Sequence, residues 1–341
     1  MKKTLVAMAV MAVAGAASAQ ATLYGRLDLG YEYLDNAGVQ TNKIQSGQFS
    51  GSRWGLRGTE DLGGGLSAVY QLEGGISADS GLSGQSNNGA TATIGGAGQA
   101  RIFGRQIFTG ISGGFGTLTL GRQYTPNDNI LGLVDPMGAT GAQAGPMYSV
   151  FTQNGANVDN MGQGRQNNSI SYSMPAMGGL GAQIMYAPDE SSATDQAFAG
   201  ANLTYSAGPL SAAVSYEQQT ITGAAKSSTG TMIGGMYDMG VARLGGAYYM
   251  GTKTTDDKIS AYYLGVSAPV GAATLSAGYA RQTLSSTGKN DATSTGFGLN
   301  ATYAMSKMTS LYAGYLNRDN VSDAGVSAKV NSFVAGMIKS F

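Results

Sequence analysis

The sequence predicts an all-β chain that closes into a 16-stranded antiparallel transmembrane β-barrel. Three observations support the barrel. Apolar residues recur at every second position in many short segments, which is the period of a β-strand. After residue 19, no apolar run approaches the roughly 18 residues of a transmembrane helix. Compact turns and long polar loops alternate between the segments, as they do in barrels that cross a membrane.

The composition excludes several classes of protein. The chain has 341 residues, of which 54 are glycine, and it contains neither cysteine nor histidine. Without these side chains the usual nucleophile and base pairs and zinc sites are missing, so we expect no enzyme, no cofactor and no metal site. Basic and acidic residues number 20 each, so that no basic excess points to nucleic acid as a partner.

Residues 1–19 are interpreted as a secretory signal peptide. A basic start at Lys2 and Lys3 precedes an apolar stretch over 5–14 and small residues over 17–19. A membrane anchor is the alternative, but the apolar stretch is shorter than the ~20 residues that cross a bilayer. Cleavage after Ala19 would leave a barrel over 20–341.

The two-residue alternation is clear in the first segment of this barrel. Leu27, Leu29 and Tyr31 share one face, and Arg26 and Asp28 share the other. We expect the apolar face to meet lipid and the polar face to line the interior. Sixteen segments show this pattern, near 22–34, 50–59, 66–76, 101–112, 116–122, 167–174, 181–187, 199–206, 210–219, 230–238, 242–250, 258–267, 273–282, 296–304, 309–316 and 331–341.

The connections between the segments also favour a membrane barrel. A soluble sandwich has no reason to place all its long loops on one side, and an even number of antiparallel strands leaves no unpaired edge in lipid. A closed sheet of this width encloses an aqueous channel unless it is plugged. The long loops lie near 35–49, 77–100, 123–166, 188–198, 220–229, 251–257, 283–295 and 317–330.

The chain ends on an aromatic residue, Phe341, in the last predicted strand. A final strand of this kind can seal against the first strand, so we expect Phe341 to take part in barrel closure. An incidental aromatic end is the alternative interpretation.

Several motifs together resemble those of one protein family. They are Thr-Leu-Tyr-Gly-Arg-Leu-Asp at 22–28, the run from Ser52 to Leu66, Gln-Leu-Glu at 71–73, the run from Ser112 to Gln123, Asn-Asn-Ser-Ile-Ser-Tyr at 167–172 and the end Gly-Met-Ile-Lys-Ser-Phe at 336–341. In this order along the chain they resemble the general trimeric porins of Gram-negative outer membranes, most closely the beta-proteobacterial and neisserial branch.

The resemblance implies an assembly and a location. The chain would be a homotrimer in the outer membrane, in contact with lipid and lipopolysaccharide. The third loop, 123–166, would fold into the barrel as a constriction, and the second loop, 77–100, would reach a neighbouring subunit.

The resemblance also assigns charged residues to the constriction. Arg53, Arg105 and Arg165, each on the polar face of its segment, would form a basic cluster on the wall, and Glu73 would take an acidic wall position. For the facing acids of the third loop, our candidates are Asp128 and Asp135.

Arg57 shares the polar face of Arg53 and is a secondary lumen charge. The alternative, which we favour for this residue, is an ion pair with Glu60 or Asp61 at the rim.

Guanidinium groups keep their charge and present fixed donors, so three arginines against a few carboxylates predict a weak preference for anions. The leading hypothesis is therefore a channel for passive diffusion of ions and small hydrophilic solutes. The alternatives are a solute-specific channel, a structural or adhesive barrel, and a barrel enzyme, for which the usual histidine base is absent.

Overall fold

The computed structural model describes residues 20–83, 101–138, 145–151, 164–189, 197–220 and 225–341. The predicted signal peptide, most of the second loop and parts of the third loop lie outside the described residues. The strands are β1 (Gln20–Asn36), β2 (Val39–Ser46), β3 (Arg53–Gly63), β4 (Leu66–Ser77), β5 (Leu82–Ser83), β6 (Gln106–Gly113), β7 (Gly116–Tyr124), β8 (Arg165–Ser173), β9 (Leu180–Ala187), β10 (Ala197–Ala207), β11 (Leu210–Thr220), β12 (Ser228–Asp238), β13 (Arg243–Thr252), β14 (Lys258–Val270), β15 (Ala273–Ser285), β16 (Ala292–Ser306), β17 (Thr309–Val321) and β18 (Ser327–Ser340).

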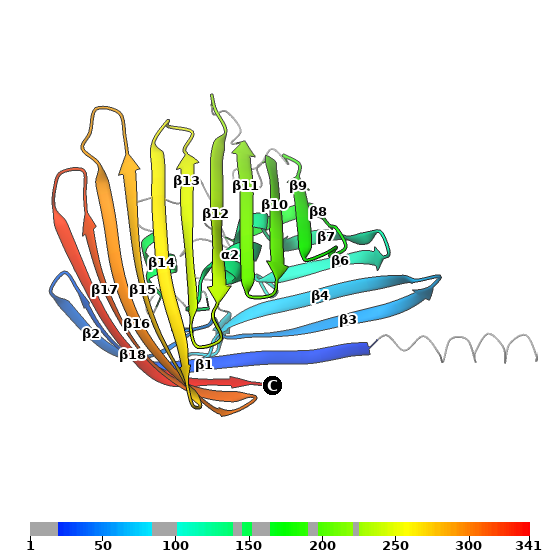
Figure 1. Cartoon of the computed structure of the whole chain (residues 1–341), viewed down its shortest axis with the longest axis horizontal. Coiled ribbons are helices and arrows are strands. Elements are labelled where there is room, and N and C mark those ends of the chain that lie inside the picture. The colour runs from blue at the N-terminus through cyan, green and yellow to red at the C-terminus, as the bar shows by residue number, and fades with distance from the viewer. Residues whose placement is uncertain (1–19, 84–100, 139–144, 152–163, 190–196, 221–224) are drawn as a thin grey trace, which may run out of the picture.

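These strands form one closed antiparallel barrel, with neighbouring strands side by side in Figure 1. β2 and β3 both pair with β1 and share one position in the wall, while the two-residue β5 pairs with β4 outside the ring. Within the described residues, sixteen wall positions therefore follow one another from β1 to β18, and β18 pairs back to β1. The prediction of a sixteen-stranded barrel is confirmed.

The two faces of the wall differ as the alternation predicts. Leu203, Ile233 and Leu264 are about half exposed on the outer face, whereas their neighbours Met232 and Tyr263 are buried on the inner face. No helix in the described parts of the chain has the length and apolar character that a membrane span requires. The strands carry the apolar surface that faces lipid.

Several predicted loops are wrong in their bounds because the strands continue further. The predicted loop at 35–49 is largely a hairpin of β1 and β2, closed by Ala37 and Gly38, both at positive φ. Such two-residue turns match the twist of paired strands. The predicted loops at 283–295 and 317–330 likewise shorten, since β15 to β18 extend into them. Polar residues indicate contact with water instead of lipid, but they do not show whether the backbone is paired. These strand ends are polar and are still paired in the sheet.

Two helices form in the third predicted loop, α2 (Pro126–Val134) and α3 (Pro146–Phe151). Each begins at a proline, which fits the first turn of a helix because its missing N–H needs no partner there. Thr125 caps α2 by accepting a hydrogen bond from the Asp128 amide. Apolar side chains of both helices, including Ile130 and Val150, are buried against inner-face residues of β11 to β15.

The seam between the first and last strands is extended by the terminal residue. The Gly25 amide donates to the Phe341 carbonyl at 2.9 Å, and the Phe341 amide donates to the Gly25 carbonyl at 3.1 Å. The Phe341 ring lies where a Gly25 side chain would stand. Phe341 thus adds one more hydrogen-bonded pair to the β1–β18 ladder.

Two glycines at this seam make room for a side-chain contact that reaches from β17 across β18 to β1. Gly30 of β1 and Gly336 of β18 are paired, and Tyr312 of β17 is aligned with Gly336. The Tyr312 hydroxyl stands 2.5 Å from the position that a Cβ at either glycine would take. It reaches over both to donate to Asp28 Oδ1.

We therefore expect Gly336→Ala to destabilise the barrel by roughly 1–3 kcal/mol, because the added methyl group would clash with the β1 backbone at Leu29 and Gly30 and would displace Tyr312 from Asp28. Urea unfolding of the refolded chain in detergent micelles measures this change. Gly114→Ala is the matched control, since a Cβ at Gly114 meets open space. Equal stability of the two variants would contradict the packing described for the seam.

Candidate functional site: a charged cluster on the inner wall

Three arginines lie at or just before the first residues of the wall strands β3, β6 and β8. Arg53 is the first residue of β3, Arg165 is the first residue of β8, and Arg105 directly precedes β6. The strand predicted over 101–112 starts only at Gln106, so Arg105 lies just outside it. The register of β4 with β6 sets Glu73 opposite Gln106 and therefore beside Arg105.

Arg105 and Glu73 form a buried ion pair. Arg105 Nε donates to Glu73 Oε1 at 2.6 Å, and the side chains are only 8% and 5% exposed. The Arg105 amide also donates to the Glu73 carbonyl, and the Tyr24 hydroxyl donates to the second carboxylate oxygen at 3.0 Å. Glu73 thus neutralises one arginine and fixes its position.

Tyr124 joins Arg105 to Arg165. Its hydroxyl accepts a hydrogen bond from Arg105 Nη2 at 2.5 Å and one from Arg165 Nη2 at 2.8 Å. The Arg165 guanidinium carbon also lies 4.4 Å from the centre of the Tyr124 ring, in cation–π distance. Sequence reasoning missed Tyr124, because the pairing of β7 with β8 shifts register between Gly121 and Gln123 and interrupts the alternation.

Arg53 is held by backbone and hydroxyl groups of the segment that precedes β3. Its Nε donates to the Gly51 carbonyl and its Nη2 donates to Ser50 Oγ, both at 2.8 Å. Arg53 also interacts electrostatically with Arg105 and Glu73. The structure therefore brings Arg53, Arg105, Arg165 and Glu73 together.

Asp128 lies in the first turn of α2 and faces this cluster. Burial raises the pKa of its carboxyl group to about 6, while the positive charges of Arg165 and Arg105 act in the opposite direction. The side chain lies against Gly164, whose φ of +66° belongs to the left-handed region and whose missing Cβ leaves space for the carboxylate. Asp128 is thus the loop acid next to the arginines.

Asp135 lies at the other end of α2, on a different part of the wall. It ends the helix, accepts a hydrogen bond from the Met137 amide at 2.8 Å and accepts another from the Tyr263 hydroxyl of β14. The structure does not bring it to the arginines. Its contacts attach the end of α2 to the wall.

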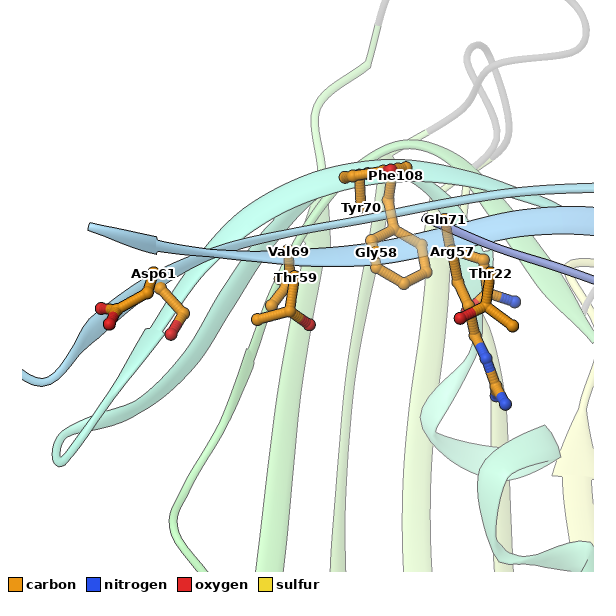
Figure 2. A pocket seen from close by; sticks show the side chains of 10 residues that line it. Thr22, Arg57, Gly58, Thr59, Asp61, Val69, Tyr70, Gln71 and Phe108 are labelled. Carbon is orange, nitrogen blue, oxygen red and sulfur yellow. The ribbon is translucent and has the colours of Figure 1, made fainter. Parts of the chain in front are cut away.

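Arg57 lies over an aromatic ring instead of forming the ion pair that we favoured. Its guanidinium carbon is 5.0 Å from the centre of the Tyr24 ring, and none of the ion pairs of the described residues joins it to Glu60 or Asp61. Arg57, Thr22 and Asp61 line a cavity of about 540 Å³. Figure 2 shows Arg57 beside Thr22. Arg57 remains a charge on the inner wall.

The arrangement separates charge across the interior. Guanidinium groups come from the wall around β3 to β8, and one carboxylate comes from the helix that faces them. Fixed positive charges of this kind can pass or briefly bind anions. Among the described residues, no group of three acidic, histidine or cysteine side chains could hold a metal ion.

Comparisons with known proteins agree on one family. A family model described as Gram-negative porin matches residues 4–323. The chain is 38% identical over 288 residues to outer membrane porin protein 32 of Delftia acidovorans, covering 80% of this chain and 77% of that protein. It is 33% identical over 384 residues to an outer membrane porin protein of Bordetella pertussis, covering 92% and 93% of the two chains.

Solved structures share the fold. An anion-selective porin from Comamonas acidovorans matches with 29% identity and a TM-score of 0.76, over 95% of this chain and all of that chain. OmpT of Vibrio cholerae in its trimer form matches with 17% identity and a TM-score of 0.70, over 95% and 99% of the two chains. The second similarity supports the fold alone.

The buried ion pair yields a stability prediction. Glu73→Gln leaves Arg105 without its carboxylate partner, so we expect the free energy of unfolding to fall by roughly 3 kcal/mol. Urea unfolding in detergent measures it, and the double variant Glu73→Gln with Arg105→Gln is the control. The double variant should be less destabilised than the sum of the two single variants. Additive effects would mean that the pair contributes no coupling energy.

Proposed function

Because the chain belongs to the Gram-negative porin family, whose members are channels of the outer membrane, we propose that it is weakly anion-selective. In this proposal it is a passive, water-filled pathway for ions and small hydrophilic solutes, and it performs no enzymatic reaction. The clustering of Arg53, Arg105 and Arg165 on one side of the inner wall is the observation that supports it most directly.

The balance of charges in the cluster supports a weak preference for anions and not a strong one. Three guanidinium groups stand against two carboxylates, those of Glu73 and Asp128, so that the cluster retains one net positive charge at neutral pH. Glu73 is already bound to Arg105. The similarity to an anion-selective porin from Comamonas acidovorans supports the same sign of preference.

The third loop is proposed to narrow the channel. Its helices α2 and α3 are buried against the inner face of β10 to β16, as the contacts of Ile130, Val134 and Val150 indicate. The helices packed against β10 to β16 reduce the open cross-section of the barrel. The remaining channel then runs next to the wall that carries the arginines. A charge at a narrow section acts on every ion that passes.

We propose a homotrimer in contact with lipid and lipopolysaccharide. The motifs that resemble those of trimeric porins support this assembly. Exposed apolar side chains cover the outer face of the strands, which suits both lipid and a neighbouring subunit.

The test uses the purified chain in a planar lipid bilayer. We expect discrete ohmic current steps and, in a potassium chloride gradient, a zero-current potential that indicates anion preference. Joint replacement of Arg53, Arg105 and Arg165 by glutamine should shift this potential towards cation preference, because the cluster loses three positive charges.

Three other outcomes would each contradict part of this proposal. Absence of current steps would overturn the channel and favour a structural or adhesive barrel. Current that one solute blocks at saturating concentration would favour a solute-specific channel. An unchanged potential in the triple variant would show that these arginines do not determine selectivity.

The pKa of Asp128 predicts a pH dependence. Its carboxyl group is charged above pH 6 and neutral below, so acidification from pH 7.5 to pH 5 removes a negative charge from the cluster. We expect the anion-to-cation permeability ratio to rise about twofold, with a midpoint near pH 6. Zero-current potentials measured across this pH range provide the test.

Other charged and titratable groups also surround Asp128. They are Arg105 and Arg165 on the wall, Tyr148 on α3 and Glu217 on β11. Asp128→Asn is therefore the control, since it removes this carboxyl group alone and should abolish the step near pH 6. An equal step in that variant would assign the titration to another group.

A further inference from the structure

Two basic residues lie on the outer face of the wall, the face that meets lipid. Lys258 of β14 and Arg281 of β15 both have exposed side chains. On β14, Lys258 shares its face with Tyr262 and Leu264, which are also exposed. On β15, Arg281 shares its face with the exposed Tyr279. A charged side chain on the lipid face of a barrel costs free energy, so these two positions indicate a specific role.

The strand register arranges this face in rows. Strands β12 to β15 lie side by side (Figure 1), and each row takes one residue from each strand. Counted towards the connection between β13 and β14, the first row is Ile233, Tyr248, Tyr262 and Arg281, the second is Thr231, Met250, Ser260 and Thr283, and the third is Thr229, Thr252, Lys258 and Ser285.

The chemistry of the surface changes along these rows. Tyr248 and Tyr262 of the first row are 42% and 40% exposed, and aromatic residues of this kind mark the boundary between hydrocarbon and lipid headgroups. The third row carries hydroxyl groups and an ammonium group. It therefore lies at the level of the headgroups, on the side of the barrel from which the longer, external loops extend.

A groove of about 480 Å³ lies over the second and third rows. Hydroxyl and ammonium groups both donate hydrogen bonds, and an ammonium group also attracts phosphate by its charge. Arg281 is aligned with Tyr262, so it lies about 13 Å from Lys258 along the strands at ~3.3 Å per residue. The groove is lined by Lys258 and by the hydroxyl-bearing residues Thr229, Thr231, Thr252, Ser260 and Ser285.

No carboxylate of the described residues neutralises either cation in an ion pair. None of the ion pairs found there includes Lys258 or Arg281. The acids that directly precede Lys258 are bound elsewhere. Asp256 pairs with Lys226 at 2.7 Å, and Asp257 accepts a hydrogen bond from a threonine of its own connection at 2.8 Å. An anion from the surroundings can therefore bind both cations without displacing an internal partner.

We propose that the groove and Arg281 form a binding site for the phosphate groups of lipopolysaccharide, the anionic lipid of the outer leaflet. One phosphate accepts hydrogen bonds from Lys258 and the hydroxyl groups of the groove. Arg281 binds a second phosphate of the same molecule at the aromatic row, and the acyl chains continue over the apolar surface beyond it. The inference rests on the proposed contact with lipopolysaccharide and names the site of that contact.

The first test measures binding of purified lipopolysaccharide to the refolded full chain in detergent micelles, by native mass spectrometry. Each basic residue at an anionic lipid surface contributes a factor of about five, so Lys258→Gln with Arg281→Gln should weaken binding roughly 25-fold.

Lys339→Gln with Arg243→Gln is the matched control. It removes the same charge from two exposed residues beside the short turns at the other end of the barrel. We expect unchanged affinity in this control. Equal weakening in both double variants would assign the binding to net charge and would overturn the site.

Two further ligands identify the group that is recognised. Lipopolysaccharide from which the phosphate groups have been removed should bind the unmodified chain as weakly as intact lipopolysaccharide binds the Lys258 and Arg281 variant. Inorganic phosphate should compete only in large excess, because it has no acyl chains to bury. Tight binding of the dephosphorylated lipid would overturn phosphate recognition, and equal competition by inorganic phosphate would overturn the lipid as its source.

A second variant tests the charge on one folded protein, and it decides the proposal if the double variant does not fold. Because the chain has no cysteine, Lys258→Cys introduces a single thiol. A trimethylammonium-bearing methanethiosulfonate reagent then adds a positive charge, and a sulfonate-bearing one adds a negative charge. We expect lipopolysaccharide to bind the first adduct roughly 25-fold more tightly, because the two adducts differ by two charges. Equal binding would overturn the site.

The outcomes separate this site from the proposed contact with lipopolysaccharide. If the unmodified chain binds no lipopolysaccharide, the proposed contact fails and the site fails with it. Binding that the double variant and the two adducts leave unchanged would overturn this site alone. Dissociation of oligomers in the double variant, with unchanged binding of the lipid, would also overturn it and would assign this face to a contact between subunits.

Discussion

Closure of the hydrogen-bonded sheet is the constraint on which the rest of the structure depends. Backbone groups in hydrocarbon find no water, so every wall strand needs a partner on both sides. β18 meets this requirement for β1, and Phe341 continues the ladder at Gly25. A ring of this many strands is too wide for its own side chains to fill. The space that remains is occupied in part by the helices α2 and α3.

The inward segments are attached to different parts of the wall by buried polar contacts. Asp28 Oδ2 accepts a hydrogen bond from the Ser50 amide between β2 and β3. Glu217 Oε1 accepts one from the Asn127 amide at the start of α2, and Arg318 Nη1 donates to Ser149 Oγ of α3. Arg53, Arg105 and Arg165 come from the wall around β3 to β8. The fold thus places packed segments over one side of the interior and basic side chains on the other.

The sequence predicts the outer face better than the inner one. Lipid requires an apolar side chain at every second position, so the alternation identifies sixteen wall positions, and family motifs identify Arg53, Arg105, Arg165 and Glu73. Inner-face contacts depend on which distant residues meet. For that reason the sequence does not indicate Tyr124, whose strand shifts register at Gly121. It places Asp135 near the arginines, whereas the structure binds this residue to Tyr263. It also suggests loops where polar strand ends are paired.

Anomalous X-ray diffraction from crystals of the protein soaked in bromide tests the central claim most directly, because it locates anions inside the channel. We predict bromide peaks next to the guanidinium groups of Arg53, Arg105 and Arg165, and none next to Asp128 at neutral pH. Bromide peaks confined to the wall away from these arginines, or an even spread through the interior, would contradict it.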